Sequence, residues 1–297
     1  MFSIEQVVSL ITGWQNKEFS CQALSGELTN MNYCLKIESE QFFVRIPGSQ
    51  AEIIAVDREN EYFNSIIASL VGVGPKVVHY LKEYNVIIME FAHGRTMSNM
   101  DMCKPGMPTR IFQSLRLLHS EPRFLHDFNM FKLIDYYLMM VKEKKVKIPP
   151  DYIDQILVLT LIEQAVNSPK LGYVPCHNDL VAENFIDAGN LLRIVDFEFS
   201  DNNDPCFDIG DAATEMALDE NQIEELCETY FGRVHPSLMA RIHRLGLVSD
   251  IGWVLWTAIQ NQISKIDFNF WRHMMFRWDR ACSLMGSEKF PRWLVNT

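Results

Sequence analysis

The sequence lacks the features that mark membrane-spanning, secreted and zinc-binding proteins. Its apolar runs all stay well below the roughly 20 residues needed to cross a bilayer. The N-terminal stretch MFSIEQVVSLITGW has no basic region and carries Glu5, so we expect no secretory signal peptide. The 7 cysteines lie singly without a CxxC pair, which favours free thiols in a reducing compartment. These absences predict a cytosolic protein.

Positive charge is also scarce, since 27 Lys and Arg residues face 38 Asp and Glu residues and the formal net charge is −11. Nucleic acids and anionic membranes are negatively charged, so this balance argues against either one as a general partner. It is compatible with a cationic small molecule. Apolar residues make up 48% of the 297 residues, a composition typical of a globular protein with a substantial core.

The first ninety residues alternate short apolar segments with helical patterns. Period-2 and period-3.6 spacing of apolar residues distinguishes strands from helices here, and Gly and Pro mark the breaks. Helices are predicted at 3–14 and 56–70, and strands at 33–38, 41–46, 76–80 and 86–91.

After Gly94 the pattern becomes mainly helical, with a polar segment between two short strands. We therefore predict two units, 1–92 and 93–297, with a hinge near Glu90–Gly94. Helices are predicted at 109–119, 131–142, 152–166, 221–231 and 238–264, and strands at 184–187 and 192–197.

The pattern that carries chemistry is HNDLVAEN at residues 177–184, followed by DFE at residues 196–198. Phosphoryl transfer needs one carboxylate to orient the attacking hydroxyl and accept its proton, and oxygen ligands for magnesium. An amide oxygen and a carboxylate suit Mg²⁺, because phosphates and waters complete its coordination. We therefore predict Asp179 as the base and Asn184 and Asp196 as Mg²⁺ ligands, brought to one edge by the short hairpin between them.

Each of these residues has a structural alternative. A single aspartate after an asparagine commonly caps a helix or a turn, and an aspartate that closes a strand is commonly solvated. The order and spacing of the three together favour the functional interpretation. For His177 we predict a neutral ring that hydrogen-bonds to the backbone of the loop, rather than a catalytic role.

With these motifs the chain resembles the choline/ethanolamine kinases, within the kinase-like group that includes the aminoglycoside phosphotransferases. The resemblance spans about Leu24 to Asp279 and includes FDIG at Phe207–Gly210. In that family the HND loop carries the catalytic aspartate and DFE carries a magnesium aspartate. The resemblance implies an α+β, bilobal protein-kinase-like fold, with a β-rich N-lobe that has one crossing helix and a mainly helical C-lobe. It also implies ATP as co-substrate.

The resemblance implies a nucleotide site in the N-lobe. Leu24–Tyr33 is similar to the family's loop over the phosphates, and Arg45 occupies the position of the kinase strand cation. Glu61, on the following helix, is the natural partner of Arg45. Met89-Glu90-Phe91 is similar to the hinge whose backbone pairs with adenine. The candidate nucleotide-binding residues are Ser25, Thr29, Asn30, Arg45, Glu61, Glu90 and Phe91.

For the acceptor, the resemblance implies a pocket made of Trp253, Trp256, Phe268 and Glu215. Aromatic faces and one carboxylate suit a trimethylammonium group, which has no N–H to donate. The two tryptophans are three residues apart and share a helix face. The alternative is that they are core residues, as aromatics at helical spacing commonly are. Near the position of a family pocket tyrosine this chain has His273.

The leading hypothesis is a kinase that phosphorylates the hydroxyl of choline to give phosphocholine, with ATP and a small cationic amino alcohol as ligands. Ethanolamine, thiamine and aminoglycosides are alternative acceptors. A catalytically silent kinase-like binding module is the alternative of another class. The sequence has no HRD, DFG or APE signature, which argues against a protein kinase. It leaves open whether the protein forms a homodimer.

Overall fold

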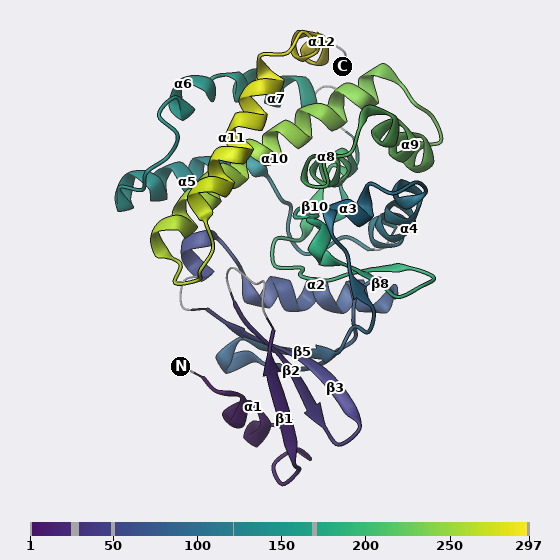
Figure 1. Ribbon diagram of the computed structural model, residues 1–297, viewed down its shortest axis with the longest axis vertical. Coiled ribbons are helices and arrows are strands. Elements are labelled where there is room, and N and C mark those ends of the chain that lie inside the picture. Colours follow the sequence, from purple (N-terminus) through teal and green to yellow (C-terminus); the bar gives the residue numbers. More distant parts are fainter. Residues whose placement is uncertain (1, 25–29, 49–50, 121, 168–170, 296–297) are drawn as a thin grey trace.

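The computed structural model describes residues 2–24, 30–48, 51–120, 122–167 and 171–295. An antiparallel sheet forms one end of the molecule and helices form the larger part (Figure 1). This arrangement confirms the predicted α+β fold class, with a β-rich N-lobe and a helical C-lobe. The division at residues 92 and 93 stays a prediction. Among the described residues, no helix is long and apolar enough to cross a membrane.

The sheet of the N-lobe has five strands in the order β1-β2-β3-β5-β4. Strand β1 was not predicted, because its residues are mostly exposed and show no apolar alternation. The first helix ends at Leu10, earlier than predicted, where Ile11 turns to extended backbone. The elements are α1 (Ile4–Leu10), β1 (Phe19–Ala23), β2 (Asn30–Ile37), β3 (Glu40–Pro47), η1 (Ala51–Ile54), α2 (Arg58–Leu70), β4 (Val77–Leu81), η2 (Lys82–Tyr84) and β5 (Val86–Glu90).

Alternation along the strands gives the sheet two different faces. Val44 and Ile46 of β3 pack with Val7 of α1 in one buried apolar cluster. Arg45, between them, therefore points to the opposite face, where it meets α2. In Figure 1, α2 lies between the sheet and the helices of the C-lobe. This alternation places a charged side chain at the boundary between the lobes.

The C-lobe contains two small sheets, of two and three strands, next to the polar loops. The helix predicted at 152–166 is two helices, because the chain turns at Ile156 and Leu157. Helices α3, α8, α11 and α12 were not predicted. The elements are β6 (Arg95–Thr96), α3 (Asn99–Met102), α4 (Met107–His119), α5 (Met130–Lys144), α6 (Tyr152–Gln155), α7 (Val158–Val166), β7 (Val174–Cys176), η3 (Ala182–Asn184), β8 (Phe185–Asp187), β9 (Leu192–Ile194), β10 (Asp201–Asn203), α8 (Pro205–Glu215), α9 (Glu220–Phe231), α10 (Pro236–Ile263), α11 (Phe270–Met285) and α12 (Phe290–Val295).

Helix α10 forms the centre of the C-lobe, and α8 crosses it at a close approach of two glycines. A Cβ atom added to Gly210 would lie 2.4 Å from the carbonyl oxygen of Ile242, and one added to Gly246 would lie 2.7 Å from that of Gly210. Backbones can come this close only where side chains are missing. The crossing fixes the position of α8, which carries Asp208 and Asp211 beneath the polar loops.

Helix α2 is also hydrogen-bonded directly to the C-lobe. Asn64 Nδ2 donates to the carbonyl oxygen of Ser200 at 2.5 Å, and Asn60 Nδ2 donates to Asp201 Oδ1 at 2.9 Å. Burial raises the pKa of the Asp201 carboxyl to about 6, although the hydrogen bond from Asn60 lowers it. The two lobes are therefore joined by short polar contacts in addition to the hinge.

Gly210→Ala should lower the free energy of unfolding, because the new methyl group meets backbone rather than a movable side chain. We expect a loss of roughly 1–3 kcal/mol, measured by thermal or urea unfolding. Gly172→Ala is the matched control, since no atom lies within 4 Å of its added Cβ. Equal stability of the two variants would show that the α8–α10 crossing is not tightly packed.

Asp201→Asn should stabilise the protein more at pH 7.5 than at pH 4.5. A carboxyl with a raised pKa holds its proton more tightly in the folded state, so its stabilising contribution is lost as pH rises from about 4 through about 6. The asparagine avoids that loss and can still accept from Asn60. Because the side chain is partly exposed, we expect a gain of only about 1–2 kcal/mol at pH 7.5. Equal stabilisation in melting curves at both pH values would contradict this account.

Candidate active site

Arg45 lies at the centre of the boundary between the lobes. Its Nη1 contacts Glu61 Oε1 at 2.7 Å and Asp196 Oδ1 at 2.5 Å, and its Nε donates to Asn32 Oδ1 at 3.4 Å. The predicted pairing of Arg45 with Glu61 is therefore present in the structure, where Glu61 is fully buried. One guanidinium thus joins β3, α2 and the DFE segment.

A second buried arginine, Arg58, completes this group. Its Nη1 contacts Glu61 Oε2 at 2.7 Å and Glu198 Oε2 at 3.0 Å. Its Nη2 donates to Asn30 Oδ1 at 2.6 Å, and Asn30 Nδ2 donates to Glu198 Oε2 at 3.0 Å. The arginine–carboxylate cluster, as we call it, consists of Arg45, Arg58, Glu61, Asp196 and Glu198.

The cluster sets different charge states for the two acids of the DFE segment. Burial alone would raise the pKa of Asp196, but the Arg45 guanidinium outweighs it and the pKa lies below its ordinary value. Burial and the charge of Asp196 raise the pKa of Glu198, against the opposing effect of Arg58. The cluster therefore favours the ionised form more strongly at Asp196 than at Glu198.

The loop that carries Asp179 is held by two aspartates of α8. The backbone N–H groups of His177 and Asn178 donate to Asp208 at 2.8 and 2.7 Å. The N–H of Leu180 donates to Asp211 Oδ2 at 2.6 Å. Because both carboxylates are fully buried, these bonds are expensive to break, and Asp179 is fixed from both sides.

His177 has the role expected from the sequence. Its Nε2–H donates to the carbonyl oxygen of Val195 at 3.0 Å, so the ring is hydrogen-bonded to backbone. Burial lowers the pKa of His177, although nearby Asp208 opposes this effect. A neutral ring that braces the loop follows from both observations.

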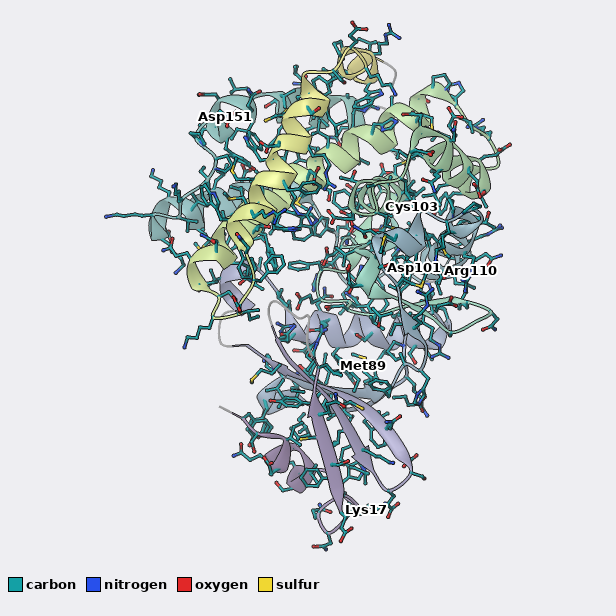
Figure 2. All side chains as sticks on the ribbon, in the orientation of Figure 1. Lys17, Met89, Asp101, Cys103, Arg110 and Asp151 are labelled. Atoms are coloured by element: carbon teal, nitrogen blue, oxygen red, sulfur yellow. The ribbon has the colours of Figure 1, made fainter. Side chains whose placement is uncertain are left out.

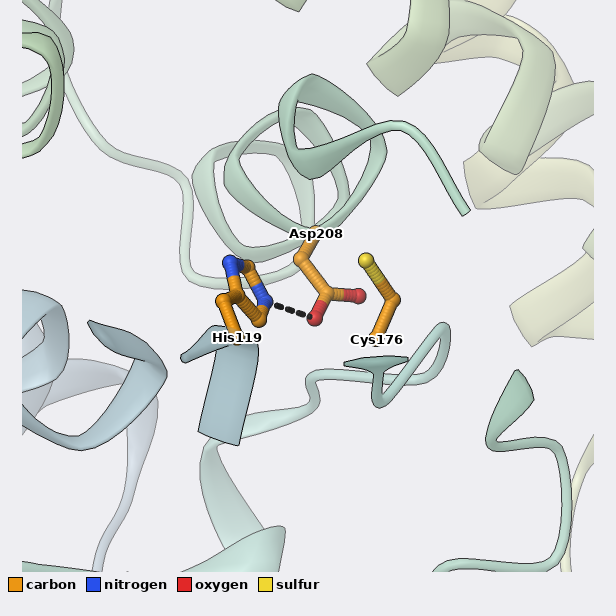
Figure 3. Close-up of side chains that lie close together, drawn as sticks. All are labelled: His119, Cys176 and Asp208. Atoms are coloured by element: carbon orange, nitrogen blue, oxygen red, sulfur yellow. Dashed lines mark hydrogen bonds and ion pairs between the residues drawn. The ribbon is translucent and has the colours of Figure 1, made fainter. Parts of the chain in front are cut away.

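Figure 3 shows a buried group of possible metal ligands next to this loop, made of His119, Cys176 and Asp208. His119 Nε2 lies 2.9 Å from Asp208 Oδ2, and its Nδ1 lies 2.7 Å from the Tyr230 hydroxyl. Burial raises the pKa of the Cys176 thiol well above its ordinary value, so the thiolate that a metal needs is disfavoured. The Asp208 oxygens already accept from backbone. We interpret this group as support for the catalytic loop.

The β8–β9 hairpin brings Asn184 and Asp196 together. Phe185 pairs with Ile194, and the N–H of Val195 donates to the carbonyl oxygen of Asn184 at 3.0 Å. Asn184 Nδ2 donates to the carbonyl oxygen of Asp179 at 3.0 Å, which turns its Oδ1 away from that bond. An amide oxygen beside an ionised carboxylate fits the donor set of Mg²⁺.

The backbone at Asp196 is itself unusual. Its φ is +71°, in the left-handed region that residues other than glycine seldom occupy. Such a conformation costs of order 1–3 kcal/mol and is commonly found at functional sites. The salt bridge to Arg45 holds the side chain in this position.

Asp179 is surrounded by other carboxylates. Burial raises its pKa well above the ordinary value, and the charges of Asp211, Asp196 and Glu215 add to this effect, whereas Arg277 opposes it. Burial and Glu215 also raise the pKa of Asp211 to about 8. A carboxylate in this setting is a stronger proton acceptor than one in water.

The hinge segment uses its N–H groups within the sheet. The N–H of Glu90 donates to the carbonyl oxygen of Lys76 at 2.8 Å, and that of Phe91 to Gln41 at 3.1 Å. Met89 precedes them at the end of β5 nearest the C-lobe (Figure 2). The N–H groups of Glu90 and Phe91 are therefore already engaged within the sheet. Ser25 and Thr29 of the predicted phosphate loop lie outside the described residues.

Of the aromatic residues predicted for the acceptor, Trp253 and Trp256 are neighbours on α10, and Phe268 lies in the segment before α11. Trp253 and Trp256 are edge-to-face with ring centroids 6.4 Å apart, and Phe199 of the DFEF segment packs against Trp253 at 4.9 Å. Phe268 is 42% exposed and its ring meets that of His273 at 5.6 Å. Both indole N–H groups are buried without a hydrogen-bond partner among the described residues. Core tryptophans normally satisfy this donor.

Glu215 is not a solvated carboxylate. Its Oε1 forms an ion pair with Arg277 and lies 3.5 Å from Arg280 Nη2. Arg277 Nε donates to His273 Nε2 at 3.0 Å. Because arginine Nε is only a donor, His273 Nε2 must be the unprotonated nitrogen, and the ring is neutral. Burial lowers the pKa of His273 to about 4, and Arg277 adds to that shift.

Sequence reasoning missed five residues of this site: Arg58, Glu198, Phe199, Asp211 and Arg277. A local signal existed for some of them. Arg58 precedes Glu61 by one helical turn and so shares its face. Glu198 and Phe199 follow Asp196 directly in the same segment. For the carboxylate partners of Arg277 no local signal existed, because Glu215 and Asp250 lie on other helices.

Comparison with known proteins agrees with the geometry. The sequence model of the choline/ethanolamine kinase family matches residues 10–281. The chain is 28% identical over 290 residues to protein LicA of Haemophilus influenzae, which covers 90% of this chain and 79% of LicA. It is 24% identical over 303 residues to human ethanolamine kinase 2, covering 90% and 76% of the two chains.

A solved structure supports the same assignment. The crystal structure of a choline/ethanolamine kinase family protein from Mesorhizobium loti superposes with a TM-score of 0.85 and 29% identity, covering 98% of this chain and 97% of that one. The protein belongs to the choline/ethanolamine kinase family, whose members are kinases that transfer a phosphoryl group to an alcohol.

Proposed function

We propose that the protein is a choline kinase that uses Mg²⁺ and ATP to phosphorylate the choline hydroxyl. The observation that carries this proposal is the position of Asp179. Its carbonyl oxygen accepts from Asn184 of the predicted metal site at 3.0 Å, and the next residue, Leu180, is bound to Asp211, one turn before Glu215 on α8. A base between a nucleotide–metal site and a receptor for a cationic head group suits transfer to an amino alcohol.

In the proposed reaction, Asp179 orients the choline hydroxyl and takes its proton. The hydroxyl oxygen forms a bond to the γ-phosphorus of ATP, while the bond from that phosphorus to the β–γ bridging oxygen breaks and its electron pair leaves with ADP. The carboxylates around Asp179 strengthen it as an acceptor for this proton. The products are phosphocholine and ADP.

The phosphates lie, in this proposal, between the N-lobe and the DFE segment. Asn184 and Asp196 would hold Mg²⁺, which when bound supplies positive charge to the phosphate oxygens. Arg45 provides a fixed guanidinium, with Glu61 holding it in place. The remaining nucleotide contacts proposed are Ser25, Thr29, Asn30, Glu90 and Phe91.

The head group binds, in this proposal, to the faces of Trp253, Trp256 and Phe268, with Glu215 behind them. Trp253 is only 3% exposed and packs in the core, whereas Trp256 is partly buried, so Trp256 and Phe268 present the accessible aromatic surface in this proposal. The partly exposed ring of Phe268 offers a face that the head group can cover.

Ethanolamine is the second candidate acceptor. The similarity to human ethanolamine kinase 2 favours it, and His273 stands near the position of a pocket tyrosine in the family. The test is an ADP-release assay with Mg²⁺ and ATP against choline, ethanolamine, thiamine and kanamycin. Turnover strongest with choline supports the proposal. Turnover with only one of the other acceptors would show that this acceptor, and not choline, is the substrate. ATP binding without turnover of any amino alcohol favours a silent binding module.

Asp179→Asn should reduce kcat by about 10²–10⁴-fold, because the amide cannot accept the hydroxyl proton. ATP binding, measured by calorimetry, should stay near its wild-type value. Asp187→Asn is the control, because Asp187 lies at the end of β8 away from Asn184 and is paired with Arg110. Retained turnover in the Asp179 variant would remove Asp179 as the base.

Trp256→Leu should raise the KM for choline while leaving the KM for ATP nearly unchanged. Leucine keeps apolar volume but removes the aromatic face, and the loss of one cation–π contact of about 0.5–2 kcal/mol corresponds to roughly 2- to 30-fold in affinity. Trp271→Leu is the control, because its ring lies under Lys147 instead. Equal changes in both KM values would show that Trp256 has a structural role.

A further inference from the structure

Beside the aromatic residues lies a buried ion cluster, made of Glu215 at the end of α8, Asp250 on α10, and Arg277 and Arg280 on α11. Arg277 Nη1 contacts Glu215 Oε1 and lies 3.3 Å from Asp250 Oδ1. Arg280 binds Asp250 through two nitrogens, at 2.7 and 2.5 Å. Two carboxylates are therefore matched by two guanidinium groups.

Burial makes this matching hard to break. The side chains of Glu215, Asp250 and Arg277 are 9%, 0% and 6% exposed. Separating a buried ion pair leaves a charge without a partner in a region of low dielectric constant, which costs several kcal/mol. Glu215 therefore stays bound to Arg277, which matches its charge before any ligand enters.

The cluster is continuous with the proposed acceptor pocket. Asp250 lies one helical turn before Trp253 on α10. On α11, His273 accepts from Arg277 Nε at 3.0 Å, and its ring packs against Phe268. Glu215, Asp250 and His273 thus hold the Arg277 side chain at the same time.

Primary and quaternary ammonium groups respond differently to such a pocket. A primary ammonium group loses three hydrogen bonds to water on entering and needs acceptors to replace them. A trimethylammonium group has no N–H, so it loses little and is satisfied by aromatic faces. A site whose carboxylate is already paired therefore disfavours the primary amine more than the quaternary one.

We propose that Arg277 is a specificity-determining residue, which by holding Glu215 makes the acceptor site select quaternary over primary ammonium alcohols. This inference rests on the proposed function, because it assumes that the pocket binds an amino alcohol. Arg277 acts through Glu215, without contact to the reacting atoms.

The test compares Arg277→Met with Arg277→Met/Glu215→Gln. Both variants lose the guanidinium, and in both Arg280 can keep its two bonds to Asp250. They differ only in whether residue 215 carries a carboxylate that has lost its pairing with Arg277. The readout is the ratio of kcat/KM for choline to kcat/KM for ethanolamine, with folding checked by thermal melting and ATP binding.

We expect Arg277→Met to lower the choline-to-ethanolamine ratio tenfold or more, and the double variant to return the ratio to within about threefold of wild type. An unchanged ratio in Arg277→Met, or the same fall in both variants, would overturn the inference. If Arg277→Met does not fold, the charge-balanced double variant decides alone. Retained choline preference there supports the inference, and a reversed preference overturns it.

The wild-type protein separates this inference from the proposed function. No turnover of any amino alcohol would overturn both. Choline turnover in wild type, with an unchanged ratio in Arg277→Met, would overturn the inference and leave the choline kinase standing. A wild-type preference for ethanolamine would remove the selectivity that Arg277 is proposed to create.

Discussion

Two buried aspartates on α8 hold the loop that carries Asp179, and the site is arranged around this contact. Asp208 accepts the N–H groups of His177 and Asn178, and Asp211 accepts that of Leu180. An aspartate buried in this way must keep its partners, since losing one costs roughly 1–3 kcal/mol or more. The loop therefore has one stable position. Helix α8 can reach it because Gly210 lets α10 approach closely.

The same need to match buried charge shapes both sides of Asp179. Toward the N-lobe, Arg45 and Arg58 neutralise much of the charge of the three acids with which they form the arginine–carboxylate cluster. Toward the acceptor, Arg277 and Arg280 pair with Glu215 and Asp250. Asp179 stands between two matched groups and beside Asp211. Its pKa is raised because burial and these neighbouring acids outweigh the nearest cation.

The fold class could be predicted from patterns of apolar residues, and the family from short motifs. Asn184 and Asp196 could be placed together because a tight hairpin joins them, and the structure shows this hairpin. Strand β1 escaped prediction because an exposed edge strand has no apolar alternation. The catalytic, metal-binding and acceptor roles of the site residues stay predictions until the variants are measured.

By itself the sequence determined what depends on neighbours along the chain: the alternation that turns Arg45 away from α1, the hairpin between Asn184 and Asp196, and the shared face of Trp253 and Trp256. Only the tertiary structure decided which charges meet. The partners of Arg277 lie on α8 and α10 as well as on its own helix. Such pairing has no signature in local spacing, because the balance between burial cost and Coulomb attraction is set by the packing of separate helices.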